Sequence, residues 1–215
     1  MSTNESRARG LLRLRHAREC HEAREEDMSH ERRRFLSLAD PASATRAIVA
    51  DQLFQAPPAL AARLAALVPA GVSTLEPSAG LGRIYRALRD IDDRPIVLVE
   101  IAPACCGELY RQIEGDTNAR LIQGDFLEQC PEQLGRFGAV VMNPPFRRGT
   151  DVQHILHACR FLSPGGVLVA VCYAGLIQET KLCPLVDSWE ELPPGSFRSE
   201  GTEAATAIVT VRAKR

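Results

Sequence analysis

Short apolar runs alternate with segments of helical periodicity through most of the chain. Five runs rich in Val, Ile, Leu and Ala have the length and composition of buried strands, and they cover residues 72–75, 95–99, 119–122, 139–142 and 166–172. Four amphipathic segments separate them and predict helices over residues 84–88, 103–113, 126–134 and 152–162. Strands that alternate with helices in this way predict a parallel sheet with both faces covered.

The two ends of this alternating region differ from its middle. Before it, Leu60, Leu64 and Val68 recur at roughly helical spacing behind a Pro-Pro pair. After it, residues 196–198 and 205–211 form two strand candidates, and the short link between them predicts an antiparallel hairpin at the sheet edge. The predicted fold class is therefore α/β: a Rossmann-like, seven-stranded, mostly parallel sheet with an antiparallel C-terminal hairpin.

Residues 1–42 have a different composition and are expected to form a separate, charged, helical arm. Between Arg7 and Arg34 the chain is dense in Arg and Glu, contains no proline and has few large apolar side chains. Such a segment is typical of a solvated helix or a partly disordered arm, and its acids offset much of its basic charge. A nucleic-acid contact, an oligomer contact and a contact with a specificity partner stay open for it. Residues 43–215 are expected to form the α/β domain.

Composition and charge restrict the functional class only modestly. Hydrophobic residues make up 45% of the 215 positions, charged residues make up 25%, and the formal net charge is -1. These values are ordinary for a globular protein. The protein has no net positive charge that would indicate a nucleic-acid partner, although a local basic patch could still bind one. No apolar run is long enough to span a bilayer and no signal peptide is recognised, so a cytoplasmic protein without a membrane partner is expected.

Cysteine and histidine spacing does not predict a metal site. None of the seven cysteines forms a CxxC pair, so the thiols are interpreted as reduced and mostly buried. Asp151, His154 and His157 follow each other at three-residue steps on a predicted helix, but they spread over too wide an arc to hold one ion. Packing and capping are the roles expected for them. Trp189 is likewise interpreted as a residue that fills the core.

The strongest chemical signal follows the first predicted strand, where residues 75–82 read Leu-Glu-Pro-Ser-Ala-Gly-Leu-Gly. Gly80 and Gly82 at the tip of a parallel strand would let the backbone turn sharply and approach a ligand closely. A dinucleotide-binding fingerprint requires a third glycine three positions after Gly82, where Tyr85 stands instead. The Gly-x-Gly pair alone is a weak signal that a simple turn also explains.

Three later strand ends strengthen this signal. The second strand ends in Glu100, which could accept hydrogen bonds from ribose hydroxyls, and the third is followed by Asp125 and Phe126. The fourth is followed by Asn-Pro-Pro-Phe over residues 143–146. A single acid of this kind is more often a helix cap or a surface residue. However, the carboxyl ends of strands in a doubly wound sheet open on one crevice, and four such ends in order are hard to obtain by accident.

Together these segments resemble the amino-methyltransferase group of class I S-adenosylmethionine-dependent enzymes. The group includes DNA adenine and cytosine amino-methyltransferases, RNA adenine methyltransferases and the glutamine methyltransferases of release factors. Residues 75–82 resemble its cofactor loop, and residues 143–146 match its Asn-Pro-Pro-aromatic signature. Residues 54–58 are similar to a segment of bacterial DNA adenine methyltransferases, and residues 197–211 resemble the last hairpin of small phage and prophage enzymes. The resemblance covers roughly residues 45–215.

The resemblance implies that S-adenosylmethionine is the cofactor. Glu76 and the loop backbone would face the methionine and ribose, Glu100 the ribose hydroxyls, and Asp125 with Phe126 the cofactor adenine. The implied cofactor-binding residues are Gln55, Pro57, Glu76, Pro77, Ser78, Gly80, Gly82, Glu100, Ile101, Asp125, Phe126 and Asn143. The implied catalytic residues are Asn143, Pro144, Pro145 and Phe146.

For these catalytic residues the resemblance implies methylation of a conjugated amino group. The Asn143 side-chain oxygen and the Pro144 carbonyl would each accept one amino hydrogen, which directs the nitrogen lone pair at the sulfonium methyl. Pro144 and Pro145 would stiffen the loop, and Phe146 would stack on a flipped target base. No metal or covalent nucleophile is required.

The predicted substrate is the N6 amino group of adenine in nucleic acid, with DNA favoured over RNA. RNA adenine methylation, protein glutamine methylation and a non-catalytic cofactor-binding module are the alternatives. The rest of the sheet occupies residues 147–215, so sequence specificity is expected from loops, the arm or a partner. Arg147 and Arg148 are candidates for phosphate contacts, and a solvated arginine pair explains them equally well.

Overall fold

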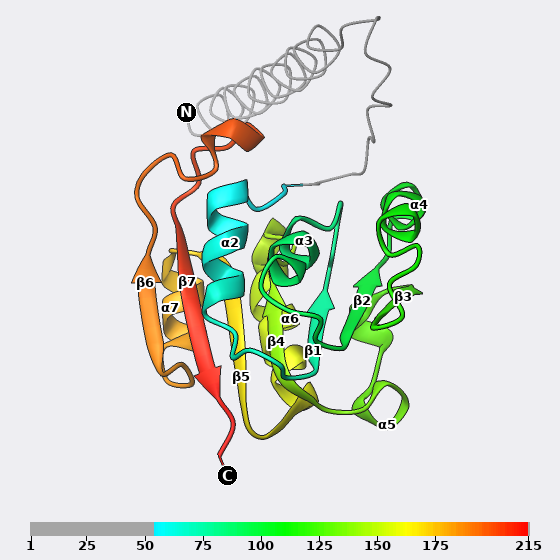
Figure 1. The fold of residues 1–215 in the computed structure, drawn as a ribbon. Coiled ribbons are helices and arrows are strands. Elements are labelled where there is room, and N and C mark those ends of the chain that lie inside the picture. Colours follow the sequence, from blue (N-terminus) through cyan, green and yellow to red (C-terminus); the bar gives the residue numbers. More distant parts are fainter. Residues whose placement is uncertain (1–53, 215) are drawn as a thin grey trace, which may run out of the picture. The chain divides into compact units, whose positions relative to one another are not determined.

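The computed structural model describes residues 54–214, which build one seven-stranded sheet between helices (Figure 1). The predicted arm over residues 1–42 and its boundary at residue 43 lie outside the described residues. In chain order the strands are β1 (Thr74–Pro77), β2 (Ile96–Glu100), β3 (Ala119–Gln123), β4 (Phe137–Met142), β5 (Leu162–Tyr173), β6 (Ser188–Glu191) and β7 (Thr206–Arg212). The helices are α2 (Pro58–Ala66), α3 (Arg83–Arg89), α4 (Pro103–Gln112), α5 (Pro131–Leu134), α6 (Thr150–Ala158) and α7 (Leu176–Leu182).

The sheet has the order β3-β2-β1-β4-β5-β7-β6. Strands β1 to β5 pair in parallel, whereas β7 runs antiparallel to both β5 and β6. The prediction of a mostly parallel seven-stranded sheet that ends in an antiparallel hairpin is therefore confirmed. The strand order reverses between β1 and β4, and such a switch point is where doubly wound sheets bind ligands.

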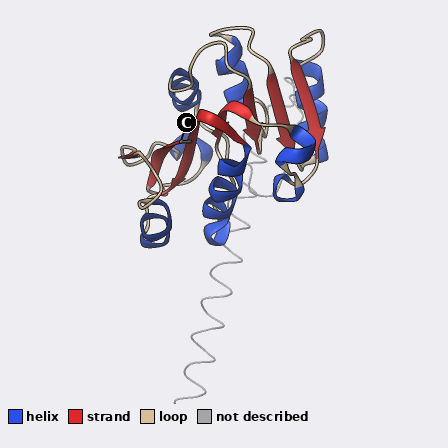
Figure 2. Ribbon diagram, turned by 90° about the horizontal axis from the view of Figure 1, so that it is seen from below, coloured by secondary structure: helices blue, strands red, loops and turns tan. Residues whose placement is uncertain are grey.

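Two apolar cores lie on opposite faces of the sheet, between the layers visible in Figure 2. One core contains residues of α2, α3 and α4, such as Leu64, Leu88 and Leu109, and the other contains Ile155 of α6 and Leu182 of α7. Alternate residues of β4 and β5 supply both cores, so these central strands are buried on both faces and read as continuous apolar runs. No helix within residues 54–214 is long and apolar enough to cross a membrane.

The predicted strand over residues 196–198 is wrong. The edge strand of the hairpin is β6, whose sequence Ser-Trp-Glu-Glu is mostly exposed, and residues 192–205 form the connection to β7. Phe197 made residues 196–198 resemble a buried strand, but Phe197 lies in a turn, from which its fully buried ring packs into the core. An edge strand is paired on one side only and can be polar, so its pattern was too weak to find. Trp189 is partly buried and packs against the core, as expected.

The predicted helix over residues 126–134 is also wrong in part. The structure has a short 3-10 turn, η1 (Phe126–Glu128), and then α5, with Gln129 and Cys130 extended between them. Pro131 explains the break, because a proline disfavours helical geometry in the residue before it. Helix α7 was not predicted, since four of its seven residues are polar and only Gln178 and Leu182 are buried.

Asp151 in the first turn of α6 holds α6, β5 and α7 together. Its fully buried carboxylate accepts hydrogen bonds from the Tyr173 backbone N–H at 3.0 Å and from Gln178 Nε2 at 3.0 and 3.1 Å. Along the chain, Tyr173 of β5 is 22 residues from Asp151 and Gln178 of α7 is 27 residues from it. The packing role expected for Asp151 is therefore confirmed: its carboxylate connects elements that are distant in the sequence.

We expect Asp151→Ala to lower the free energy of unfolding by about 2–4 kcal/mol, because two buried donors lose their acceptor. Chemical denaturation followed by circular dichroism measures this change. Asp187→Ala is the matched control, since the exposed Asp187 carboxylate also accepts one backbone N–H, from Arg212 at 2.6 Å. Equal losses for the two variants would contradict a special role for Asp151.

Candidate active site

The carboxyl ends of β1, β2, β3 and β4 open on a cavity of about 590 Å³. The segment over residues 54–56 and the first turns of α3, α4 and α6 complete its wall. Twelve of the residues predicted for the site line this cavity: Gln55, Glu76, Ser78, Gly80, Glu100, Ile101, Asp125, Phe126, Asn143, Pro144, Pro145 and Phe146. The structure thus brings together residues that lie up to 91 positions apart in the sequence.

Three predicted cofactor residues lie outside the cavity lining and shape its loops. Pro77 is the buried last residue of β1, and Pro57 is the N-cap of α2. Gly82 is the N-cap of α3 with φ 74°, and a Cβ atom there would approach Gln112 Oε1 to 2.6 Å and Leu109 Cδ2 to 2.9 Å. Only glycine fits both this backbone conformation and this space.

The loop between β1 and α3 turns through several left-handed residues. Ser78 has φ 60° and Gly80 has φ 55°. The Gly80 N–H donates to Glu100 Oε2 at 2.7 Å, and the Leu81 N–H donates to Gln55 Oε1 at 3.2 Å. A left-handed conformation is costly for a serine, so these side-chain contacts from two other segments hold the loop in its shape.

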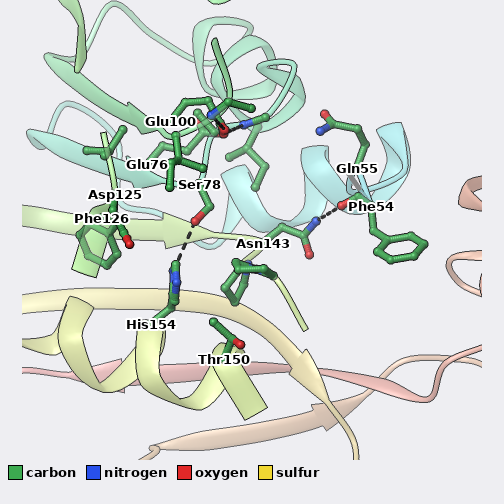
Figure 3. Close-up of a pocket in the computed structure, with 18 of the residues that line it drawn as sticks. Phe54, Gln55, Glu76, Ser78, Glu100, Asp125, Phe126, Asn143, Thr150 and His154 are labelled. Atoms are coloured by element: carbon green, nitrogen blue, oxygen red, sulfur yellow. Dashed lines mark hydrogen bonds between the residues drawn. The ribbon is translucent and has the colours of Figure 1, made fainter. Parts of the chain in front are cut away.

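Glu100 at the end of β2 is bound by backbone groups on both of its oxygens. Besides the bond from Gly80 to Oε2, Oε1 accepts a hydrogen bond from the Ala102 N–H at 2.8 Å. These bonds fix the carboxylate at the wall of the cavity, as Figure 3 shows. Each oxygen retains a second lone pair, so the fixed carboxylate can still accept a hydrogen bond from a ligand.

Glu76 at the end of β1 is fully buried beside Glu100. Burial, followed by the charge of Glu100, raises its pKa well above the ordinary value for a glutamate. Its Oε2 atom has no hydrogen-bond partner within residues 54–214. Two neighbouring carboxylates, one of which has a buried oxygen with no partner among these residues, favour a ligand that brings positive charge and hydrogen-bond donors.

The residues that follow β3 form one end of the cavity in Figure 3. Asp125 Oδ1 accepts a hydrogen bond from the Leu127 N–H at 2.8 Å and so begins the turn η1. The buried Phe126 ring packs against His154 and His157 of α6, with ring centroids 5.8 and 4.9 Å apart. His154 in turn approaches Ser78 Oγ to 3.3 Å through Nδ1.

Asn143 lies between Asp125 and Phe54 in Figure 3, with its side-chain amide directed toward Phe54. Its Nδ2 donates to the Phe54 backbone oxygen at 2.7 Å, which fixes the side-chain amide, while its buried Oδ1 has no partner within residues 54–214. Phe146 is 4% exposed and packs against Tyr173 and Phe197 at centroid distances of 4.9 and 6.0 Å. Its ring is therefore supported from inside the protein.

The sequence did not indicate Arg83, Thr150 or His154 as cavity residues. His154 was interpreted as a packing residue, and burial lowers its pKa to about 4, so its imidazole is neutral near pH 7. No local pattern could have found these residues, because they reach the cavity through the packing of α3 and α6. No cluster of three or more His, Cys, Asp or Glu side chains within the described part of the chain is arranged to hold a metal ion.

The raised pKa of Glu76 predicts a pH-dependent stability of the unliganded protein. The folded state holds this proton more tightly than the unfolded state, so the stabilisation is complete at low pH and is lost as pH rises through the raised pKa. We expect Glu76→Gln to raise the melting temperature near neutral pH and to flatten its pH dependence above the ordinary glutamate pKa of 4.5. Thermal unfolding over this range, with the exposed Glu114→Gln as control, measures both. An unchanged melting curve would contradict the prediction.

Comparison with known proteins agrees with this fold. Residues 60–193 match the methyltransferase small domain family. Three solved structures show the same fold. PH1948 from Pyrococcus horikoshii has a TM-score of 0.62 at 17% identity, with 79% of this chain and 92% of that chain covered. TrmN from Thermus thermophilus has a TM-score of 0.59 at 17% identity, and the match covers 73% of this chain and 48% of that chain. The 23S rRNA methyltransferase ErmE has a TM-score of 0.54 at 22% identity, and the match covers 72% of this chain and 67% of that chain.

No curated protein matches the sequence of this chain. The family match, however, spans more than half of the chain and extends from α2 through β6, so it includes the β1–α3 loop and the ends of the first four strands. Methyltransferases of this family use S-adenosylmethionine, and the acid-lined cavity suits a cationic cofactor. The chain belongs to the methyltransferase small domain family and is a class I S-adenosylmethionine-dependent methyltransferase.

Proposed function

We propose that this protein transfers a methyl group from S-adenosylmethionine to the exocyclic N6 amino group of an adenine in nucleic acid, with DNA as the preferred substrate. The observation that carries the proposal is the state of Asn143. Its Nδ2 is held by the Phe54 carbonyl, and its buried Oδ1, at the wall of the cavity, has no partner among residues 54–214. An acceptor that is fixed and unused in this way is suited to an amino group.

Asn143 and Pro144 would act together on the adenine amino group. Asn143 Oδ1 accepts one amino hydrogen, and the carbonyl oxygen of Pro144 accepts the other. Held from both hydrogens, the nitrogen becomes more tetrahedral, and its lone pair points at the methyl group. Bound S-adenosylmethionine would supply the methyl group for the new N–C bond and keep the electron pair of the broken S–C bond on sulfur, and the methylated nitrogen would lose one proton to solvent. Pro144 and Pro145 restrict the backbone, so the carbonyl stays aimed.

The cavity has the groups that S-adenosylmethionine requires. The cofactor supplies a methyl group on a sulfonium centre. Glu76 would receive the ammonium group, Glu100 would accept from the ribose hydroxyls, and Asp125 would accept from the adenine amino group beside the Phe126 ring. Of these, Glu76 has a buried oxygen without a partner, and both Glu100 oxygens have one lone pair in reserve. These roles rest on the chemistry of the donor and acceptor sets.

RNA adenine is the second candidate substrate. ErmE is a 23S rRNA methyltransferase, RNA methylation has been suggested for PH1948, and both have this fold. The likeness at 17% and 22% identity extends to the fold alone, so the choice of DNA rests on the resemblance of residues 54–58 and 197–211 to DNA adenine methyltransferases. The buried position of Phe146 against Tyr173 and Phe197 suits a rigid platform for a base in either nucleic acid.

The proposal is tested with radiolabelled cofactor and separate pools of unmethylated DNA, RNA and protein. We expect label in DNA, and nucleoside digestion should place it in N6-methyldeoxyadenosine. Label in N6-methyladenosine would identify RNA as the substrate instead. Label in protein glutamine, or cofactor binding without transfer to any pool, would contradict the proposal.

Asn143→Ala should abolish methyl transfer and preserve cofactor binding. The lost oxygen acts on the amino group in the transition state, so we expect a loss in the single-turnover rate of about 10²-fold or more. Calorimetry should give a cofactor dissociation constant within about twofold of the wild-type value. Asn118→Ala is the matched control, because the Asn118 amide also donates to a backbone carbonyl, that of Asp93, at the amino end of β3. Near-normal transfer by the Asn143 variant would contradict the amino-methyltransferase mechanism.

A further inference from the structure

Among residues 54–214, three carboxylates line the cavity, those of Glu76, Glu100 and Asp125, together with one cationic side chain, that of Arg83. His154 adds no charge near pH 7, because burial lowers its pKa to about 4. S-adenosylmethionine has a sulfonium group, an ammonium group and a carboxylate. The acids can receive the two cationic groups, but they repel the carboxylate, which needs a cation or a set of donors of its own.

Arg83 contacts residue 56 at the end of the cavity where the roles proposed for Glu76 and Asp125 would place the methionine part of the cofactor. Its Nη1 donates to the Ala56 carbonyl at 3.1 Å, and Asn143 Nδ2 donates to the carbonyl of Phe54 two residues earlier. Arg83 and Asn143 therefore hold the same short segment. Asp125, which follows β3, is at the other end of the cavity (Figure 3).

The guanidinium of Arg83 is oriented by the protein and still has free donors. Nη1 uses its two hydrogens on the Ala56 carbonyl and on Glu200 Oε1, at 3.1 and 2.6 Å. Nε and Nη2 make no hydrogen bond to any residue within 54–214. These two nitrogens form the edge of a guanidinium that matches a carboxylate in a bidentate manner.

We propose that Arg83 binds the α-carboxylate of S-adenosylmethionine through its Nε and Nη2 edge, with Glu200 as the residue that positions the guanidinium. Glu200 lies in η4 (Arg198–Glu200) of the β6–β7 connection, and the Arg83–Glu200 pair is largely shielded, with side-chain exposures of 28% and 13%. This subsite deepens the cofactor site of the proposed function and does not depend on whether the methyl acceptor is DNA or RNA.

The subsite predicts that Arg83 distinguishes ligands by their carboxylate. The probes are S-adenosylmethionine and its decarboxylated analogue, S-adenosyl-3-methylthiopropylamine, and titration calorimetry on the full chain gives both dissociation constants. We expect the wild-type protein to bind S-adenosylmethionine about 10–100-fold more tightly than the analogue, the range expected for a charge-assisted bidentate contact. Arg83→Met should lose this preference by binding S-adenosylmethionine more weakly, with affinity for the analogue unchanged within about twofold.

Two further variants separate a ligand contact from a structural role. Arg83→Lys keeps the charge without the bidentate edge and should restore part of the preference. Arg86→Met is the matched control, since Arg86 is exposed on the same helix, does not line the cavity and should leave both affinities unchanged. Thermal unfolding confirms that each variant is folded.

Three results would overturn the subsite. Arg83→Met could weaken both ligands equally, which would make Arg83 a clamp on residues 54–56 and on the β6–β7 connection. It could also leave both affinities unchanged, which would exclude a contact. If the wild-type protein bound neither ligand, the cofactor assignment itself would fail. Normal ligand preference together with no transfer to nucleic acid would contradict only the proposed substrate.

Discussion

The parallel pairing of β1 with β2 and β4, and of β2 with β3, is the constraint on which the site depends. Parallel strands have their carboxyl ends on one edge, so Glu76, Glu100, Asp125 and Asn143 meet although each follows a different strand. The buried neighbours Leu75, Val99 and Met142 fix the strands in register and depth. Packing in two apolar cores thereby sets the positions of the polar groups at the strand ends.

The cavity concentrates negative charge where the folded protein has little with which to neutralise it. Glu76 is buried beside Glu100, and its desolvation costs stability in the unliganded state. A ligand that brings positive charge removes this cost. The buried Glu76 carboxylate therefore destabilises the unliganded protein and stabilises the complex with the ligand. The strained φ of 60° at Ser78, in the loop that faces this ligand, is a second cost at the same place.

Residues 54–56 connect the parts of the site. The Phe54 carbonyl holds Asn143, the Gln55 side chain holds the Leu81 N–H, and the Ala56 carbonyl holds Arg83. One short segment thus contacts the loop after β4, the loop after β1 and the first residue of α3. Through Arg83 and Glu200 it also reaches the β6–β7 connection, so the antiparallel edge of the sheet contributes to a cavity that the parallel strands build.

The sequence by itself determined the alternating strands and helices, the Gly-x-Gly loop and the residues at four strand ends, because each is encoded by a local pattern or a contiguous motif. It did not determine β6 or α7, whose polar sequences follow from their exposed positions, and it misread Phe197, whose core role is tertiary. Only the tertiary structure decided that Arg83 and His154 line the cavity and that Asn143 retains a free acceptor. Those properties arise from contacts between residues 27 to 117 positions apart, which no local pattern records.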